Sequence, residues 1–86
     1  MEGNVKVVDE ELAIEMMPET TKIRNHLINH GSITQAEATR LYGITRLAAV
    51  IYKLRYKIEP LMDIKMVMCY GKNRFGKQIQ YGKYYI

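Results

Sequence analysis

Two short helices joined by a tight turn are predicted between residues 32 and 56, and this pair constrains the fold more than any other stretch. Thr34 and Glu37 have the capping-box spacing, in which the hydroxyl accepts from the Glu37 amide and the carboxylate accepts from the Thr34 amide. Gly43 stands where a helix needs a left-handed residue in order to end. We therefore expect a helix that starts after Thr34, a sharp turn at Gly43, and a second helix directly behind it.

The second helix is predicted over residues 45–56, with Thr45 as its cap. Its apolar side chains recur at the spacing i, i+3, i+4, i+7, which gives a narrow buried stripe. This stripe consists of Leu47, Val50, Ile51 and Leu54. The opposite face and its flanks carry small, aromatic and basic residues: Thr45, Arg46, Ala49, Tyr52, Lys53, Arg55 and Tyr56. Small residues allow the backbone to approach a major groove, and Arg, Tyr and Thr can reach phosphates and base edges. The competing interpretation is an ordinary amphipathic surface helix.

A helix is also predicted upstream, from about Thr20 to His30, capped by Thr20 or Thr21 and ended by Gly31. Its expected buried stripe is Ile23, Leu27 and Ile28; in the next helix Ala38 and Leu41 are expected to face inward. His26 and His30 share a face at metal-ligand spacing, but no third ligand is evident, so we expect two surface histidines and no metal.

A β-hairpin is predicted after Pro60, which breaks the last helix. Residues 64–70 alternate as in a half-buried strand, residues 71–76 form a loop, and a second strand follows with a one-residue bulge at Gly82. The apolar side of the hairpin is expected to pack on the helices. Its tip carries Lys72, Arg74 and Lys77. Arg74 is the best candidate for a minor groove, where negative potential is concentrated; a solvated turn is the alternative.

Charge divides the chain into two parts. Residues 1–19 hold six acids and one base, a net charge of −5, whereas residues 20–86 hold 12 bases and three acids, a net charge of +9. We therefore predict an acidic N-terminal extension over 1–19 and a basic domain over 20–86. The positive charge of this domain attracts polyanions; the alternative interpretation is that the charge serves only solubility. The extension is either a disordered tail or a short helix from Asp9, and it could fold over the basic face and compete with DNA.

The length and composition exclude several classes of protein. Eighty-six residues suffice for one small domain, for which a homodimer is plausible. One cysteine, no secretory signal and no apolar run long enough to span a membrane favour the cytoplasm. No catalytic spacing of Ser, Cys, His or carboxylates stands out and no phosphate-binding glycine loop is present, so we expect neither an enzyme nor a cofactor.

Three helices followed by a basic-tipped hairpin is the order of a winged helix-turn-helix, an α+β fold. The chain resembles a small helix-turn-helix family common in phages and prophages, whose members typically read "HGSIT…EA…GITRLSARIxDLR" and close with "N-R-x-G-K". The resemblance covers about residues 20–86 and includes "HGSIT" at 30–34, "GITRL" at 43–47 and the wing at 73–77. It departs at 48–50, where Ala-Ala-Val replaces the usual Ser-Ala-Arg.

The resemblance implies a non-enzymatic protein that binds double-stranded DNA, with helix 45–56 in the major groove and wing 72–77 on the backbone or in the minor groove. A small transcriptional regulator or a recombination accessory such as an excisionase is the leading hypothesis. The alternative is a phage-encoded inhibitor that uses the same scaffold to bind a host protein or a nucleoprotein defence complex. The substitutions within 48–50 and the acidic extension favour this alternative slightly.

Overall fold

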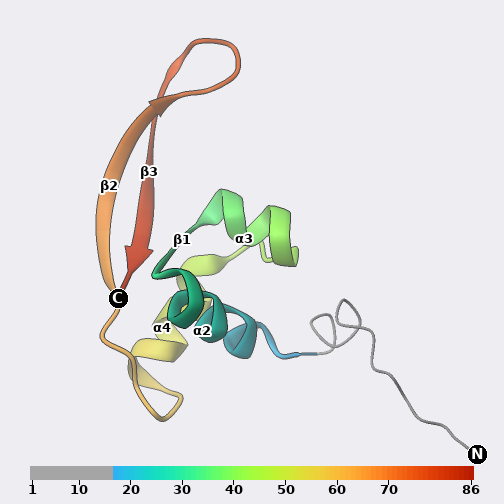
Figure 1. Cartoon of the computed structure of the whole chain (residues 1–86), viewed down its shortest axis with the longest axis vertical. Coiled ribbons are helices and arrows are strands. Elements are labelled where there is room, and N and C mark those ends of the chain that lie inside the picture. Colours follow the sequence, from blue (N-terminus) through green and yellow to red (C-terminus); the bar gives the residue numbers. More distant parts are fainter. Residues whose placement is uncertain (1–16) are drawn as a thin grey trace, which may run out of the picture.

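The computed structural model describes residues 17–86. Within them, helices and strands follow in the order α2 (Glu19–His30), β1 (Ser32–Thr34), α3 (Gln35–Tyr42), α4 (Leu47–Tyr56), β2 (Lys65–Lys72) and β3 (Gln78–Tyr85) (Figure 1). The α+β class predicted from the sequence is confirmed. The helix expected from Asp9 and the competition of the tail with DNA lie outside the described residues. No helix in the described part is long and apolar enough to cross a membrane.

The start and end signals of α3 are where the sequence predicts them. The Thr34 hydroxyl accepts from the Glu37 amide at 3.2 Å, and the Glu37 carboxylate accepts from the Thr34 amide at 3.0 Å. Gly43 ends the helix in the left-handed conformation, with φ at 67°, which L side chains rarely adopt. The capping box and the glycine together fix the length of α3 at two turns.

The start of α4 differs from the prediction. Thr45 was expected to cap the helix, but the helix begins at Leu47 and Arg46 is in the cap position. The Arg46 side chain makes no capping hydrogen bond. The first helical amide is satisfied from another element instead, because Gln35 Oε1 accepts from the Leu47 amide at 2.9 Å. A side chain twelve residues upstream therefore replaces the local cap.

The buried face of α2 is also rotated relative to the prediction. Ile28, expected in the core, is 61% exposed, whereas His26 is 7% exposed. These two residues lie about 100° to either side of Leu27 on the helix, so only one of them can share its buried side. The end of α3 covers the His26 side, where the Tyr42 hydroxyl lies 2.7 Å from the ring. Leu41, also expected inward, is exposed.

One hydrophobic core lies between the three helices and the base of the sheet. The apolar stripe of α4 is buried as predicted. The core residues are Ile23, Leu27, Ile33, Ala38, Ile44, Leu47, Val50, Ile51, Leu54 and Ile64, with Tyr42, Met62 and Tyr84 packed against them. Burying each Leu or Ile side chain contributes roughly 1.5–3 kcal/mol, so this small cluster is the main source of stability for the helical part.

A short strand that the sequence analysis missed joins the hairpin to the helices. β1 pairs antiparallel with the end of β3, with Ile33 opposite Tyr84, and the order of the sheet is β1-β3-β2. Three residues are too few to show a period in the sequence, and they lie between a helix stop and a helix start. β2 is an edge strand along its whole length within the described chain.

The hairpin packs on the helices only at its base, contrary to the prediction. β2 and β3 pair over eight residues, so the ribbon extends about 26 Å, roughly twice the length of α3. Figure 1 shows it rising beyond the helices. Met66 and Met68 remain nearly half exposed, while Tyr84 is packed against the core.

The bulge predicted at Gly82 is absent. The register of β2 and β3 is continuous, and Gly82 pairs with Met68. A side chain at Gly82 would come within 3.3 Å of the Met66 sulfur, because that thioether lies across the glycine. The glycine thus leaves room for a neighbouring side chain instead of marking an extra residue. Without a bulge, Tyr81 and Tyr84 lie on opposite faces of the ribbon.

Candidate nucleic-acid interface

The outer face of α4 and the turn before it form a continuous exposed surface. Thr45, Arg46, Ala49, Tyr52, Lys53 and Tyr56 are all exposed. The core-facing stripe, including Leu47 and Leu54, is almost completely buried, so this helix presents one side to the body and the other to solvent. Of the residues predicted on α4, these six are therefore available to an external partner.

Tyr52 and Tyr56 form an aromatic pair on this surface. Their ring centroids are 5.2 Å apart with the planes inclined by 54°, and the side chains are 52% and 61% exposed. The Lys57 ammonium lies 5.9 Å from the Tyr52 ring centroid. Lys57 was missed by the sequence analysis, although its place five residues after Tyr52 on a basic helix was an available signal. Two hydroxyl-bearing rings with a cation beside them can contact sugars, phosphates or base edges.

Arg55 has a different position from the other predicted residues. Its Nε donates to the Ile64 carbonyl at 2.8 Å, and its guanidinium lies 5.9 Å from the centre of the Tyr84 ring. These contacts connect the end of α4 to the base of the ribbon, and Arg55 is half-buried. Its guanidinium thus joins two parts of the fold, in contrast to the exposed Lys53 two residues earlier.

The turn that presents α4 is held by two side chains of α3. The Gln35 amide nitrogen donates to the Ile44 carbonyl at 2.7 Å and to the Thr39 hydroxyl at 2.9 Å, and its oxygen accepts from the Leu47 amide. The Thr39 hydroxyl donates to the same Ile44 carbonyl at 3.0 Å. This network fixes the start of α4 relative to α3, and it involves residues that the sequence analysis assigned no role.

The tip of the ribbon is an ordered basic turn. Lys72, Arg74 and Lys77 are exposed there as the sequence suggested. Asn73 organises the turn: its side-chain oxygen accepts from the amides of Phe75 at 2.9 Å and Lys77 at 3.0 Å. Figure 1 shows the tip far from α4, so the two groups of predicted site residues do not form one patch. They could contact separate stretches of an extended ligand.

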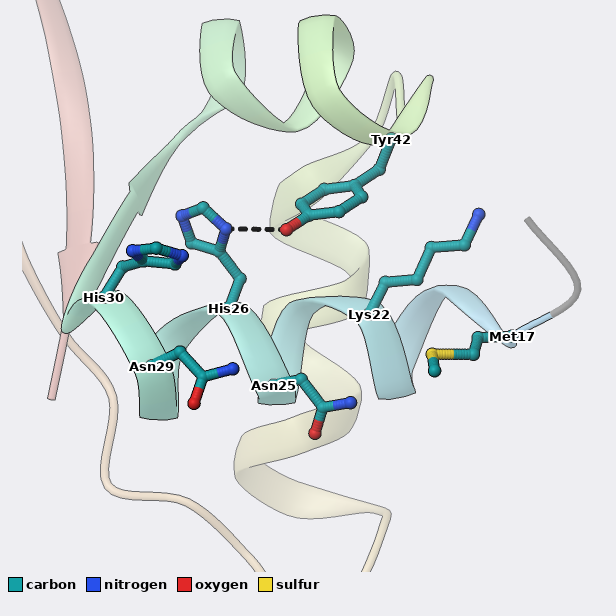
Figure 2. A pocket seen from close by; sticks show the side chains of 7 residues that line it. All are labelled: Met17, Lys22, Asn25, His26, Asn29, His30 and Tyr42. Atoms are coloured by element: carbon teal, nitrogen blue, oxygen red, sulfur yellow. Dashed lines mark hydrogen bonds between the residues drawn. The ribbon is translucent and has the colours of Figure 1, made fainter. Parts of the chain in front are cut away.

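A polar hollow of about 280 Å³ lies beside α2, and Figure 2 shows the side chains that line it. The Tyr42 hydroxyl and Nδ1 of His26 are hydrogen-bonded at 2.7 Å, and the centroids of the His26 and His30 rings are 4.6 Å apart. The surface position expected for His26 is therefore wrong. In residues 17–86 no group of three or more His, Cys, Asp or Glu side chains is placed to hold a metal ion.

Burial sets the protonation behaviour of this pair. Desolvation lowers the pKa of His26, and the nearby His30 lowers it further, while Glu37 and a backbone hydrogen bond to Ser32 raise it. Burial and Glu37 both raise the pKa of Tyr42. Both groups are therefore held in their neutral forms, which suits a structural hydrogen bond between two helices.

Comparison with known proteins identifies the helical part of the chain. Residues 19–57 match the family model described as a winged helix-turn-helix domain. No curated protein and no solved structure matches the chain significantly. The family match supports DNA binding, and domains of this family are typically non-enzymatic. With α3, the turn at Gly43 and α4 followed by a β-hairpin, the chain has the fold of a winged helix-turn-helix domain, and its residues 19–57 are similar to that family.

Proposed function

We propose that this protein is a DNA-binding protein of phage type that acts as a small transcriptional regulator or a recombination accessory. The outer face of α4 enters the major groove, and the basic wing at residues 72–77 follows the backbone or the adjacent minor groove. The resemblance to small phage and prophage proteins supports the phage assignment. A homodimer on a palindromic site is the arrangement that would give a small domain a useful affinity.

The exposed face of α4 is the observation that carries this proposal. An α-helix fits the width of the major groove of B-DNA. On α4 the small Ala49 lies between two ends that carry Arg46 and the Tyr52–Tyr56 pair, all exposed. Nine net positive charges in residues 20–86 add an attraction to phosphates that does not depend on sequence.

Selection of binding sites from random DNA tests the proposal, followed by titration of variants on the selected site. Arg46→Ala or Tyr52→Ala should cost about 1–3 kcal/mol of binding free energy and change the preference between sites, because these side chains read bases. Arg74→Ala should weaken binding to every sequence, because Arg74 contacts phosphate. It should also reduce the slope of the logarithm of the binding constant against the logarithm of salt concentration by about one unit.

Lys22→Ala is the matched control, since it removes one positive charge from α2, which belongs to neither α4 nor the turn of the ribbon. It should change affinity less than Arg74→Ala. If Arg46→Ala and Tyr52→Ala weaken binding uniformly on all sequences, then α4 grips phosphates only and the regulator proposal loses its basis. If selection yields no enriched site, sequence-specific regulation is wrong.

A second candidate is a phage-encoded inhibitor of a host protein or nucleoprotein defence complex. The ribbon favours it, because Met66, Met68, Tyr70 and Tyr81 are 41–74% exposed, more apolar surface than contact with phosphates requires. Gel shifts against genomic fragments with competitor DNA distinguish the two. A regulator forms a discrete complex at a preferred site, whereas an inhibitor binds all fragments weakly and is recovered with one defined host protein.

A further inference from the structure

The most exposed large apolar side chain in the described residues lies at the tip of the ribbon. Phe75 is 77% exposed, and it occupies the turn between β2 and β3. A large apolar ring this exposed is not part of the hydrophobic core of the described residues. Its neighbours show that the position of its backbone is fixed.

Four hydrogen bonds close the turn around Phe75. The Asn73 side chain accepts from the amides of Phe75 and Lys77, the Asn73 amide donates to the Lys77 carbonyl at 2.9 Å, and the Gly76 amide donates to the Asn73 carbonyl at 3.0 Å. Gly76 has φ at 81°, which allows the chain to reverse. The ring therefore projects from a turn that is already ordered, so that little conformational entropy is lost when it binds.

The charges around the ring indicate what it would meet. The Arg74 guanidinium lies 5.1 Å from the centre of the Phe75 ring, and Lys72 and Lys77 flank the turn. Residues 64–86 contain five bases and no acid. The five bases are Lys65, Lys72, Arg74, Lys77 and Lys83.

 

The ribbon is therefore uniformly positive, and its apolar tip is surrounded by cations. A polyanion with flat apolar faces inside it, such as duplex DNA, is the partner that this combination fits.

The ribbon also gives the tip the necessary reach. Because Lys83–Tyr85 pair with β1 in the body, the five remaining pairs of the ribbon carry the turn about 16 Å further out, beyond the helices in Figure 1. The tip can therefore contact DNA outside the stretch covered by α4. Apolar side chains inserted between base steps unstack them and kink the duplex, most easily at TA and CA steps.

We propose that Phe75 is a wedge that inserts between base pairs from the minor groove and bends the DNA, with Arg74 beside it in the groove. This inference rests on the proposed DNA binding and adds an architectural activity to it. Bending by an arm suits either a regulator or a recombination accessory, because both need distant stretches of DNA brought together.

Short duplexes with a fluorophore at each end and 2-aminopurine at a central TA step test the proposal. The protein should raise energy transfer between the ends and increase 2-aminopurine fluorescence as the step unstacks. Phe75→Ala should abolish both signals and weaken binding by about tenfold, since a stacked aromatic contact is lost. Phe75→Leu should retain much of the bend, because an apolar side chain can still act as a wedge.

Tyr70→Ala is the matched control, since Tyr70 is 74% exposed on the same ribbon but belongs to β2 and not to the turn. It should leave both signals unchanged. Binding of the unaltered protein without unstacking or bending would overturn the wedge and leave the proposed DNA binding intact. Bending by Phe75→Ala equal to that of the unaltered protein would also overturn it. Absence of binding to any duplex would refute both proposals.

Discussion

The contact between His26 and Tyr42 shows how one side chain can link two helices. The ring belongs to the third turn of α2 and the hydroxyl to the last residue of α3, and the two atoms are 2.7 Å apart. Because the ring is almost buried, its charged form is disfavoured. The position of the end of α3, and with it the turn that leads to α4, thus depends on a neutral histidine.

The stability of the fold should therefore fall in mild acid. The pKa of His26 is lower in the folded state than in the unfolded chain, so its contribution to stability is fully present above about pH 6.5, the ordinary histidine value. That contribution is lost as the pH falls from this value through the folded-state pKa. Urea unfolding at a series of pH values measures it.

The variant His26→Gln is the control for this titration, because a glutamine carboxamide can still hydrogen-bond with Tyr42 but does not ionise in this range. It should show a smaller loss of stability between pH 7.5 and 5 than the unaltered protein does. An equal loss in the two proteins would assign the effect to groups other than His26.

At the scale of elements, α3 and α4 behave as one unit because a single carboxamide joins them. Gln35 lies in the first turn of α3 and contacts both the turn carbonyl at Ile44 and the first amide of α4 at Leu47. Since the first amides of a helix have no partner within it, this contact replaces a cap. The orientation of the proposed reading face depends on it.

Replacing Gln35 by alanine should destabilise the fold by about 1–2 kcal/mol, the usual cost of losing a helix cap. Urea unfolding followed by circular dichroism measures this. Gln35→Glu keeps the acceptor for Leu47 but loses the donor to Ile44, so it should fall between alanine and the unaltered protein. Gln78→Ala, an exposed glutamine on β3, is the control. Equal midpoints for Gln35→Ala and Gln78→Ala would contradict the role of this network.

The elements that the sequence predicted well depend on neighbours a few residues away. The Thr34–Glu37 capping box and the stop at Gly43 are local, and both are confirmed. The features that were missed involve long separations: β1 pairs with a strand about fifty residues later, and Arg55 contacts Ile64 and Tyr84. Local spacing carries no information about such partners, so the packing of the hairpin was predicted incorrectly.

The candidate site divides in the same way. Exposure of the α4 face follows from the position of its buried stripe, which the sequence reveals. The sequence does not reveal which basic side chains are hydrogen-bonded within the fold. Arg24 and Arg55, for example, both donate to backbone carbonyls of the segment after α4. Their positions in the sequence give no sign of these contacts.

At the scale of the whole molecule, the ribbon separates two surfaces that could act together. α4 lies in the body and the basic turn lies at the far end of the ribbon (Figure 1). A ligand that contacts both must be long, which a DNA duplex is and a small molecule is not. The geometry thus favours an extended partner over a compact one.

The open edge of β2 has a further consequence. Residues 66–71 are uncharged and lie between Lys65 and Lys72. If two copies paired antiparallel along this edge with the centres of their strands aligned, each Lys65 would face the Lys72 of the other copy. Repulsion between these lysines should oppose such pairing at low salt, and screening at about 1 M salt, where the Debye length is about 3 Å, should remove that barrier.

We therefore expect self-association to increase with salt, which sedimentation velocity at low and high salt would measure. Val67→Lys adds a charge in the middle of the edge and should prevent association, whereas Lys83→Ala on β3 should not. Association that weakens as salt rises would contradict this account. Concentrated salt is commonly used to remove nucleic acid from basic proteins during purification. For this protein that step would also favour aggregation, because it would screen the repulsion by which Lys65 and Lys72 keep the edges of two copies apart.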